Sequence, residues 1–113
     1  MKNGIVEVGD QLVARRRIPF RHEIHPGQPL AWTEARDDEL VRLGLPVTRF
    51  RGVSFPAGAR GKIVFWDQTA GRILVQGCHG FHWDPGDCSY FWFPSGWFHG
   101  QWQVVDSAGV PLT

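Results

Sequence analysis

The chain has 113 residues, 42% of them hydrophobic and 20% charged, and its formal net charge is +1. This length suits one domain spanning residues 1–113, and the composition excludes an intrinsically disordered chain. The apolar runs are short, so we expect no membrane-spanning segment. The N-terminus lacks the long apolar stretch of a signal peptide, which favours a cytoplasmic protein.

Charge is unevenly distributed along the chain. All 12 Lys and Arg lie at or before Arg72, so residues 1–72 carry a net charge of +4 and residues 73–113 carry −3. This asymmetry predicts a basic face and a second face that is neutral or acidic. The pI near 7.9 is lower than a dedicated nucleic-acid-binding domain would be expected to have.

Residues 6–15 form the first predicted strand, entered through a Gly-Asp turn. Leu12 and Ala14 would point to one face and Gln11 and Val13 to the other, because side chains alternate along a strand.

Residues 18–54 are predicted to be a long insertion that carries the one expected helix. Pro19, Pro26 and Pro29 predict an irregular start to this insertion. Thr33 is the expected N-cap of a helix over residues 34–43, which ends at the following glycine and proline. The expected buried side of that helix is Leu40, Val41 and Leu43.

The C-terminal half is predicted to be β-rich. A short strand is expected over residues 47–50, then strands over residues 62–66, 72–76, 88–93 and 97–106. Residues 67–71 form a hairpin loop, and residues 77–87 form a longer loop with a turn at 84–87. Trp102 and Val104 should face the core, and residues 107–113 should be a flexible tail.

Two segments are similar to SH3-like small barrels of the KOW and Tudor type. Residues 8–14 resemble the opening strand of such barrels, and residues 56–64 resemble the entry to the second strand. Gly58 and Gly61 would supply positive φ angles there. The resemblance implies a five-stranded barrel, here with residues 18–54 inserted. Such barrels bind proteins, methylated side chains, peptides or nucleic acid.

Eleven of the fifteen aromatic residues lie between Phe65 and Trp102. Strand alternation places Tyr90 and Trp92 on one face and Phe91 and Phe93 on the other, and a small barrel cannot enclose both pairs. Either the insertion covers the second face, or the rings form an exposed patch for a partner or a second copy of the chain.

The cysteines and histidines of the second half allow a metal hypothesis. Zinc takes four thiolate or imidazole ligands, and the candidate set is Cys78, His82, Cys88 and His99. The spacing lacks paired Cys-x2-Cys knuckles, so we expect no bound metal or cofactor. A zinc-binding domain, or a small enzyme using these residues, remains an alternative interpretation. A third alternative is an aromatic cage for a methylated cation, built from Trp83, Tyr90, Trp92 and Trp97.

The hypothesis that these observations favour is a non-catalytic binding module. Its partner would be a protein, contacted through arginines and aromatic loops, and nucleic acid is the alternative partner. Small domains of this kind include phage inhibitors of host machinery. The expected contact residues are Arg15, Arg16, Arg17, Arg21, Arg60, Trp83, Tyr90, Trp92 and Trp97.

Overall fold

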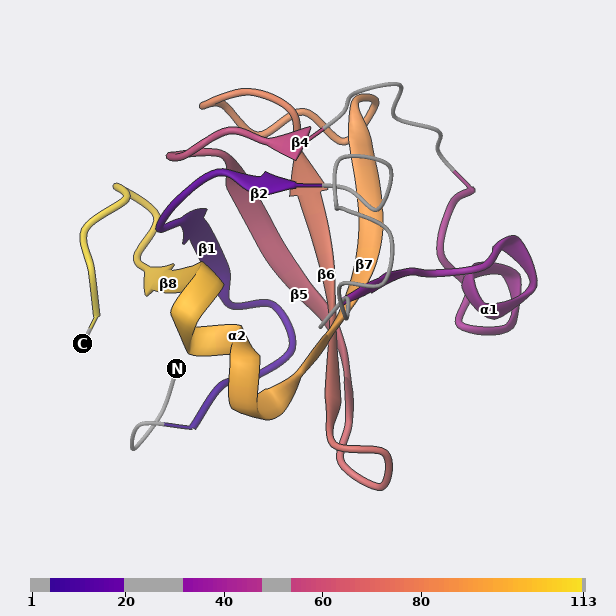
Figure 1. Ribbon diagram of the computed structural model, residues 1–113. Helices are drawn as coiled ribbons and strands as arrows, with labels where there is room; N and C mark the ends of the chain where they lie inside the picture. Colours follow the sequence, from indigo (N-terminus) through magenta and orange to yellow (C-terminus); the bar gives the residue numbers. More distant parts are fainter. Residues whose placement is uncertain (1–4, 20–31, 48–53, 113) are drawn as a thin grey trace.

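The chain folds around one six-stranded antiparallel sheet (Figure 1). The computed structural model describes residues 5–19, 32–47 and 54–112. The strand order is β3-β7-β6-β5-β1-β8, and a separate two-stranded ladder joins β2 to β4. In chain order the strands are β1 (Gln11–Ala14), β2 (Ile18–Pro19), β3 (Thr33–Glu34), β4 (Ser54–Phe55), β5 (Arg60–Asp67), β6 (Arg72–Cys78), β7 (Cys88–Pro94) and β8 (Trp102–Val105).

Strand β1 pairs with both β5 and β8, so the first and last strands of the chain lie side by side. The outermost strands of the sheet are β3 and β8, and no ladder among the described residues joins them. The prediction of a mostly β protein is confirmed, whereas no closed barrel is found in the described part of the chain.

The inner face of the sheet holds the main core. Leu12 and Ala14 are buried on β1, and Trp102 and Val104 are buried on β8, which confirms the predicted alternation of both strands. Phe55 on β4, directly after the insertion, packs edge-on against Trp102 at 5.7 Å between ring centres. The core cluster comprises Val6, Leu12, Ala14, Ile18, Phe55, Ala59, Ile63, Ile73, Val75, Phe91, Phe93, Phe98, Trp102 and Val104.

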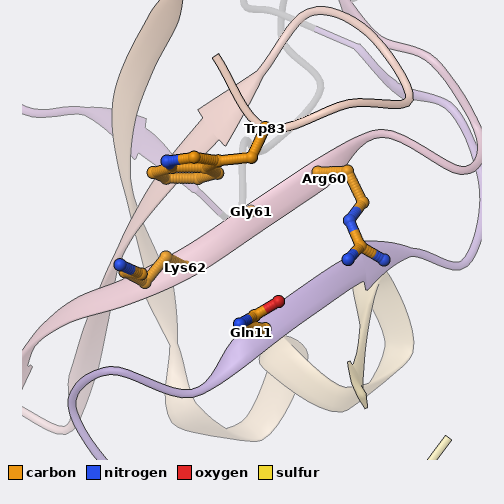
Figure 2. Close-up of a pocket in the computed structure, with 5 residues that line it drawn as sticks. All are labelled: Gln11, Arg60, Gly61, Lys62 and Trp83. Carbon is orange, nitrogen blue, oxygen red and sulfur yellow. The ribbon is translucent and has the colours of Figure 1, made fainter. Parts of the chain in front are cut away.

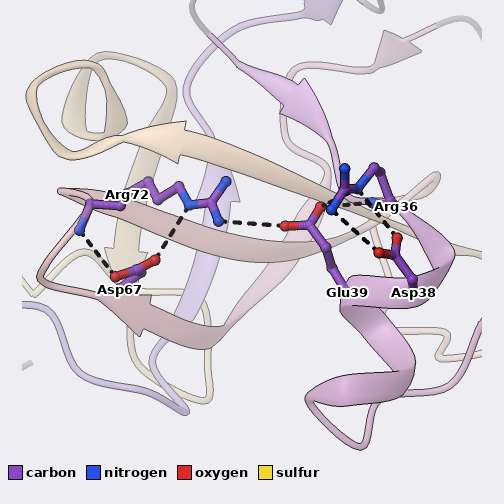
Figure 3. A network of polar contacts seen from close by, with 6 residues as sticks. Arg36, Asp38, Glu39, Asp67 and Arg72 are labelled. Carbon is purple, nitrogen blue, oxygen red and sulfur yellow. Dashed lines mark hydrogen bonds and ion pairs between the residues drawn. The ribbon is translucent and has the colours of Figure 1, made fainter.

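The outer face of β6 and β7 is covered by the insertion. Helix α1 (Asp37–Arg42) buries Leu40 in a second cluster with Leu74, Tyr90 and Trp92. Of the two alternatives for the surplus aromatic rings, cover by the insertion is therefore the one observed. An Arg72–Glu39 ion pair at 3.4 Å joins α1 to β6 (Figure 3).

Helix α1 is shorter than predicted. Residues Thr33–Glu34 form β3 against β7 instead of the first helical turn, and the N-cap is Arg36. The Glu39 carboxylate accepts a hydrogen bond from the Arg36 N–H at 3.0 Å. Val41 was expected to be buried but is 67% exposed, because it lies about 100° around the helix from Leu40, which faces the sheet.

A second helix, α2 (Ser95–Gln101), was not predicted. The expected strand over residues 97–106 is wrong for its first half, and only β8 remains of it. Phe98 and Gln101 are the buried residues of α2, and Trp102 follows one residue later. Phe98 and Gln101 have the i, i+3 spacing of one helix face, and their packing outweighs the low helix propensity of Gly96 and Gly100.

Glycine has two different roles near the start of β5. Gly58 has a φ of +87°, as the sequence predicts. Gly61 does not adopt a positive φ, contrary to the prediction. It fits a tight space instead, because a Cβ there would lie 3.0 Å from the Trp102 ring, closer than ordinary van der Waals contact.

The C-terminal residues fold back on β8. Asp106 Oδ1 accepts hydrogen bonds from the N–H groups of Ala108 and Val110, both at 2.9 Å, and Pro111 forms a β-bridge with Val105. The short strand predicted over residues 47–50 falls mostly outside the described residues, and Val47 is not in a strand. No helix in the described ranges is long and apolar enough to cross a membrane.

Candidate functional site

A cavity of about 140 Å³ lies on the outer face of β1 and β5, on the half of the sheet that α1 leaves open. Figure 2 shows Trp83 standing over β5, with Arg60 and Lys62 on either side of Gly61 and Gln11 facing them from β1. We call this site the Trp83 pocket, and its lining residues are Gln11, Arg60, Gly61, Lys62 and Trp83.

The register of the sheet brings the polar side chains of the pocket together. Arg60 and Lys62 are two residues apart on β5 and therefore share a face. Gln11 is directly opposite Lys62 in the β1–β5 ladder. Gly61 between them is buried against Trp102 on the other face of the sheet. The side chains of Arg60 and Lys62 therefore point away from the core and into the pocket.

The Trp83 pocket is positively charged. Lys62 Nζ lies 5.2 Å from the centre of the Trp83 ring, within the range of a cation–π contact. Among the described residues, no carboxylate lies within ion-pair distance of Arg60 or Lys62. The two cations and the indole are therefore available to an anionic group from outside the molecule.

The loop over residues 79–87, which we call the Trp83 loop, carries the exposed rings of this region. Phe81 is 64% exposed and Trp83 is 39% exposed. The predicted turn is present, because the Asp87 N–H donates to the Asp84 carbonyl at 3.1 Å. Phe81 lies over Gly58, where an added Cβ would be 3.2 Å from the ring.

Two buried thiols anchor the Trp83 loop. The Sγ atoms of Cys78 and Cys88 are 3.3 Å apart, and the Cys88 thiol also donates to the Asp84 carbonyl at 2.8 Å. The Cys88 thiol is also close enough to donate its hydrogen to a Cys78 thiolate in place of the Asp84 carbonyl, which lowers the pKa of the Cys78 thiol to about 7, although burial opposes this shift. The same hydrogen bond, followed by burial, raises the pKa of Cys88.

The structure brings only part of the predicted contact set together. Arg60 and Trp83 share the Trp83 pocket. The run Arg15–Arg17 is exposed immediately after β1 but does not line the pocket, and the Arg15 Nε donates to the Trp102 carbonyl at 3.2 Å. Arg21 lies outside the described residues.

The other three predicted aromatic contacts lie elsewhere. Tyr90 and Trp92 are only 2% and 4% exposed because α1 covers them, whereas Trp97 is 57% exposed on α2. The four rings proposed for an aromatic cage are thus split between the buried α1 cluster, the Trp83 pocket and the surface of α2.

The proposed metal ligands are likewise not assembled. Cys78 and Cys88 are adjacent, but within the described ranges no group of three or more His, Cys, Asp or Glu side chains is placed to hold a metal ion. His82 and His99 are both exposed, on the Trp83 loop and on α2.

Gln11 and Lys62 are site residues that were not predicted as contacts. The shared face of Arg60 and Lys62 follows from β5 beginning at Arg60, two residues before the strand predicted from the sequence. The position of Gln11 opposite Lys62 depends on the β1–β5 register, for which the sequence carries no direct signal.

No protein-family model, curated protein or solved structure matches the chain.

Proposed function

We propose that this chain is a non-catalytic binding module that uses the Trp83 pocket and the adjoining Trp83 loop to contact an acidic segment of a protein partner. The observation that carries the proposal is the exposed Trp83 ring beside Arg60 and Lys62, which have no carboxylate partner among the described residues.

The chemistry of this surface suits a protein ligand. Tryptophan and arginine are the residues most enriched among those that dominate binding energy at protein interfaces. Arg60 can bind a carboxylate through two parallel hydrogen bonds, and Lys62 adds a point charge. Phe81 extends the apolar area beyond the pocket, which favours a partner whose acidic residues are mixed with apolar ones.

The same residues also support single-stranded nucleic acid as a second candidate ligand. Exposed rings can stack on bases while cations contact phosphates. The basic part of the pocket is small, however, with only Arg60 and Lys62 among its lining residues, and the chain after residue 72 has a net charge of −3. These features favour the protein partner.

We also propose that the sheet is related to the SH3-like barrels. Support comes from β1, which pairs with both β5 and β8 and so places the first and last strands of the chain next to each other. The sequence resemblance of residues 8–14 and 56–64 coincides with β1 and the entry to β5.

The test is affinity capture with the tagged wild-type chain, with and without nuclease, followed by reconstitution with each captured protein in purified form. Trp83→Ala should weaken the reconstituted complex at least about tenfold, and the double variant Arg60→Gln, Lys62→Gln should do the same. Trp97→Ala is the matched control, since it removes an exposed indole outside the pocket.

The outcome that contradicts the proposal is a partner whose affinity is unchanged by the Trp83 and Arg60/Lys62 substitutions. Loss of binding through Trp97→Ala alone would place the contact on α2. Capture that disappears with nuclease, together with an affinity that falls steeply with salt, would support the nucleic-acid candidate instead.

A further inference from the structure

Cys78 and Cys88 occupy directly opposed positions at the ends of β6 and β7. The neighbouring His79 N–H donates to the Asp87 carbonyl at 3.3 Å, which makes the two cysteines a non-hydrogen-bonded pair of the antiparallel ladder. In such a pair the Cα atoms approach to about 4.5 Å, within the range that a disulfide can bridge. With 3.3 Å between the Sγ atoms, small side-chain rotations suffice to form the bond.

The reduced thiols hold the Trp83 loop through its turn residue Asp84. The Cys88 S–H donates to the Asp84 carbonyl at 2.8 Å, and the Asp84 N–H donates to the Cys78 sulfur at 3.3 Å. Asp84 directly follows Trp83 in the chain, so these hydrogen bonds position the backbone next to the indole that stands over Lys62.

We propose that Cys78 and Cys88 form a reversible disulfide when the protein meets hydrogen peroxide, and that this oxidation releases the Trp83 loop from its thiol anchor. Both sulfurs are fully buried, which favours a small oxidant over a bulky disulfide reagent and favours reaction with each other over reaction with a second molecule.

The chemistry proceeds in two balanced steps. The Cys78 thiolate attacks one oxygen of hydrogen peroxide and breaks the O–O bond, which gives a sulfenic acid on Cys78 and a hydroxide that takes up a proton to become water. The Cys88 sulfur, on losing its proton, then attacks the Cys78 sulfur and releases a second water. Two electrons pass from the thiols to peroxide, and the protein loses two hydrogen atoms.

Oxidation changes the hydrogen bonding of Asp84. A disulfide sulfur carries no hydrogen, so the Asp84 carbonyl loses its 2.8 Å donor, while the ends of β6 and β7 become covalently joined. The loop ends are thus tied and the loop tip is freed. Resting on the proposed function, this predicts weaker binding through Trp83 in the oxidised protein.

The test treats purified, reduced protein with hydrogen peroxide and measures intact mass. The expected product is a monomer lighter by about 2 Da that returns to the starting mass with a reductant. Cys88→Ser, which lacks the resolving thiol, should instead gain about 16 Da and react with a sulfenic-acid probe. Stepwise over-oxidation of wild-type protein without a 2 Da loss, or disulfide-linked dimers alone, would overturn the proposal.

Release of the Trp83 loop is measured separately, by acrylamide quenching of tryptophan fluorescence. The Trp83 signal is the difference in fluorescence between wild-type protein and the Trp83→Phe variant. Quenching of this Trp83 signal should rise on oxidation, and an unchanged signal would refute release of the loop. Neither measurement requires a partner. If oxidation and Trp83→Ala both leave binding unchanged, the proposed function fails while the mass and quenching results still decide the disulfide.

Discussion

The Arg72 guanidinium on β6 forms an ion pair with the Glu39 carboxylate on α1, with 3.4 Å between Nη2 and Oε2 (Figure 3). The Glu39 side chain is only 9% exposed, and the same guanidinium lies 3.8 Å from the centre of the Trp92 ring. Arg72 thereby joins the helix of the insertion to the aromatic face that it covers.

Arg72→Ala should destabilise the protein by about 2 kcal/mol, because it removes one of the two arginines paired with the buried Glu39 carboxylate, leaving only Arg36, and also removes a cation–π contact. The measurement is the free energy of unfolding in urea. Arg42→Ala removes an exposed arginine from the last turn of α1 and should change the stability by less than about 0.5 kcal/mol. Equal effects of the two substitutions would show that Arg72 adds nothing to docking of α1.

Gly77→Ala tests the close approach of β6 to Phe55 on β4. A Cβ at this position would lie 2.6 Å from the buried Phe55 ring, so we expect a loss of about 1–3 kcal/mol from overpacking. Gly80→Ala is the matched control, because a Cβ there meets nothing within 4 Å. In a double-mutant cycle with Phe55→Leu, the two substitutions should destabilise less together than the sum of their separate effects. Strict additivity would mean that residue 77 and the ring do not meet.

Phe98→Ala tests whether α2 is held by its buried face. Phe98 is fully buried, and its truncation should cost about 3–5 kcal/mol, which thermal and urea unfolding will detect. Trp97→Ala, one residue earlier and exposed, should leave stability within about 0.5 kcal/mol of wild type. The reverse order of effects would contradict the orientation of α2.

Alternation and turn residues were enough to predict most of the sheet. The strands that became β5, β6 and β7 were expected within two residues of their bounds, since each is a run of apolar and aromatic residues between Gly- and Asp-containing turns. Helix α2 was missed because Gly96 and Gly100 disfavour a helix. Its stability comes from Phe98 packing in the core, which local propensity does not register.

The site was less predictable than the fold. Composition indicated that arginines and aromatic rings would form the contact surface, and Arg60 and Trp83 do line the same pocket. Tyr90 and Trp92 look the same in the sequence as exposed rings, and only the position of α1 shows that they are covered. The Lys62–Gln11 register and the fold of Trp83 over Lys62 arise from long-range pairing, which no local pattern encodes.

Peroxide oxidation of the cysteine pair should accelerate with rising pH and reach half its maximal rate near pH 7. The hydrogen bond from Cys88 lowers the pKa of Cys78 to about 7, against the opposing effects of burial and of the Asp84 and Asp87 carboxylates. The reactive thiolate is therefore scarce at pH 6 and predominant at pH 8, and the rate of the 2 Da mass loss should increase roughly tenfold between them.

The Cys88→Ala variant provides the control for this pH dependence, with sulfenic-acid formation on Cys78 as the measured reaction. Alanine removes the thiol that donates to Cys78, so the pKa of Cys78 should rise and the midpoint of the rate profile should move above that of wild type. Wild-type and Cys88→Ala profiles with the same midpoint would show that the Cys88 hydrogen bond does not stabilise the thiolate. A wild-type rate independent of pH between 6 and 8 would show that opening of the Trp83 loop, rather than ionisation of Cys78, limits the reaction.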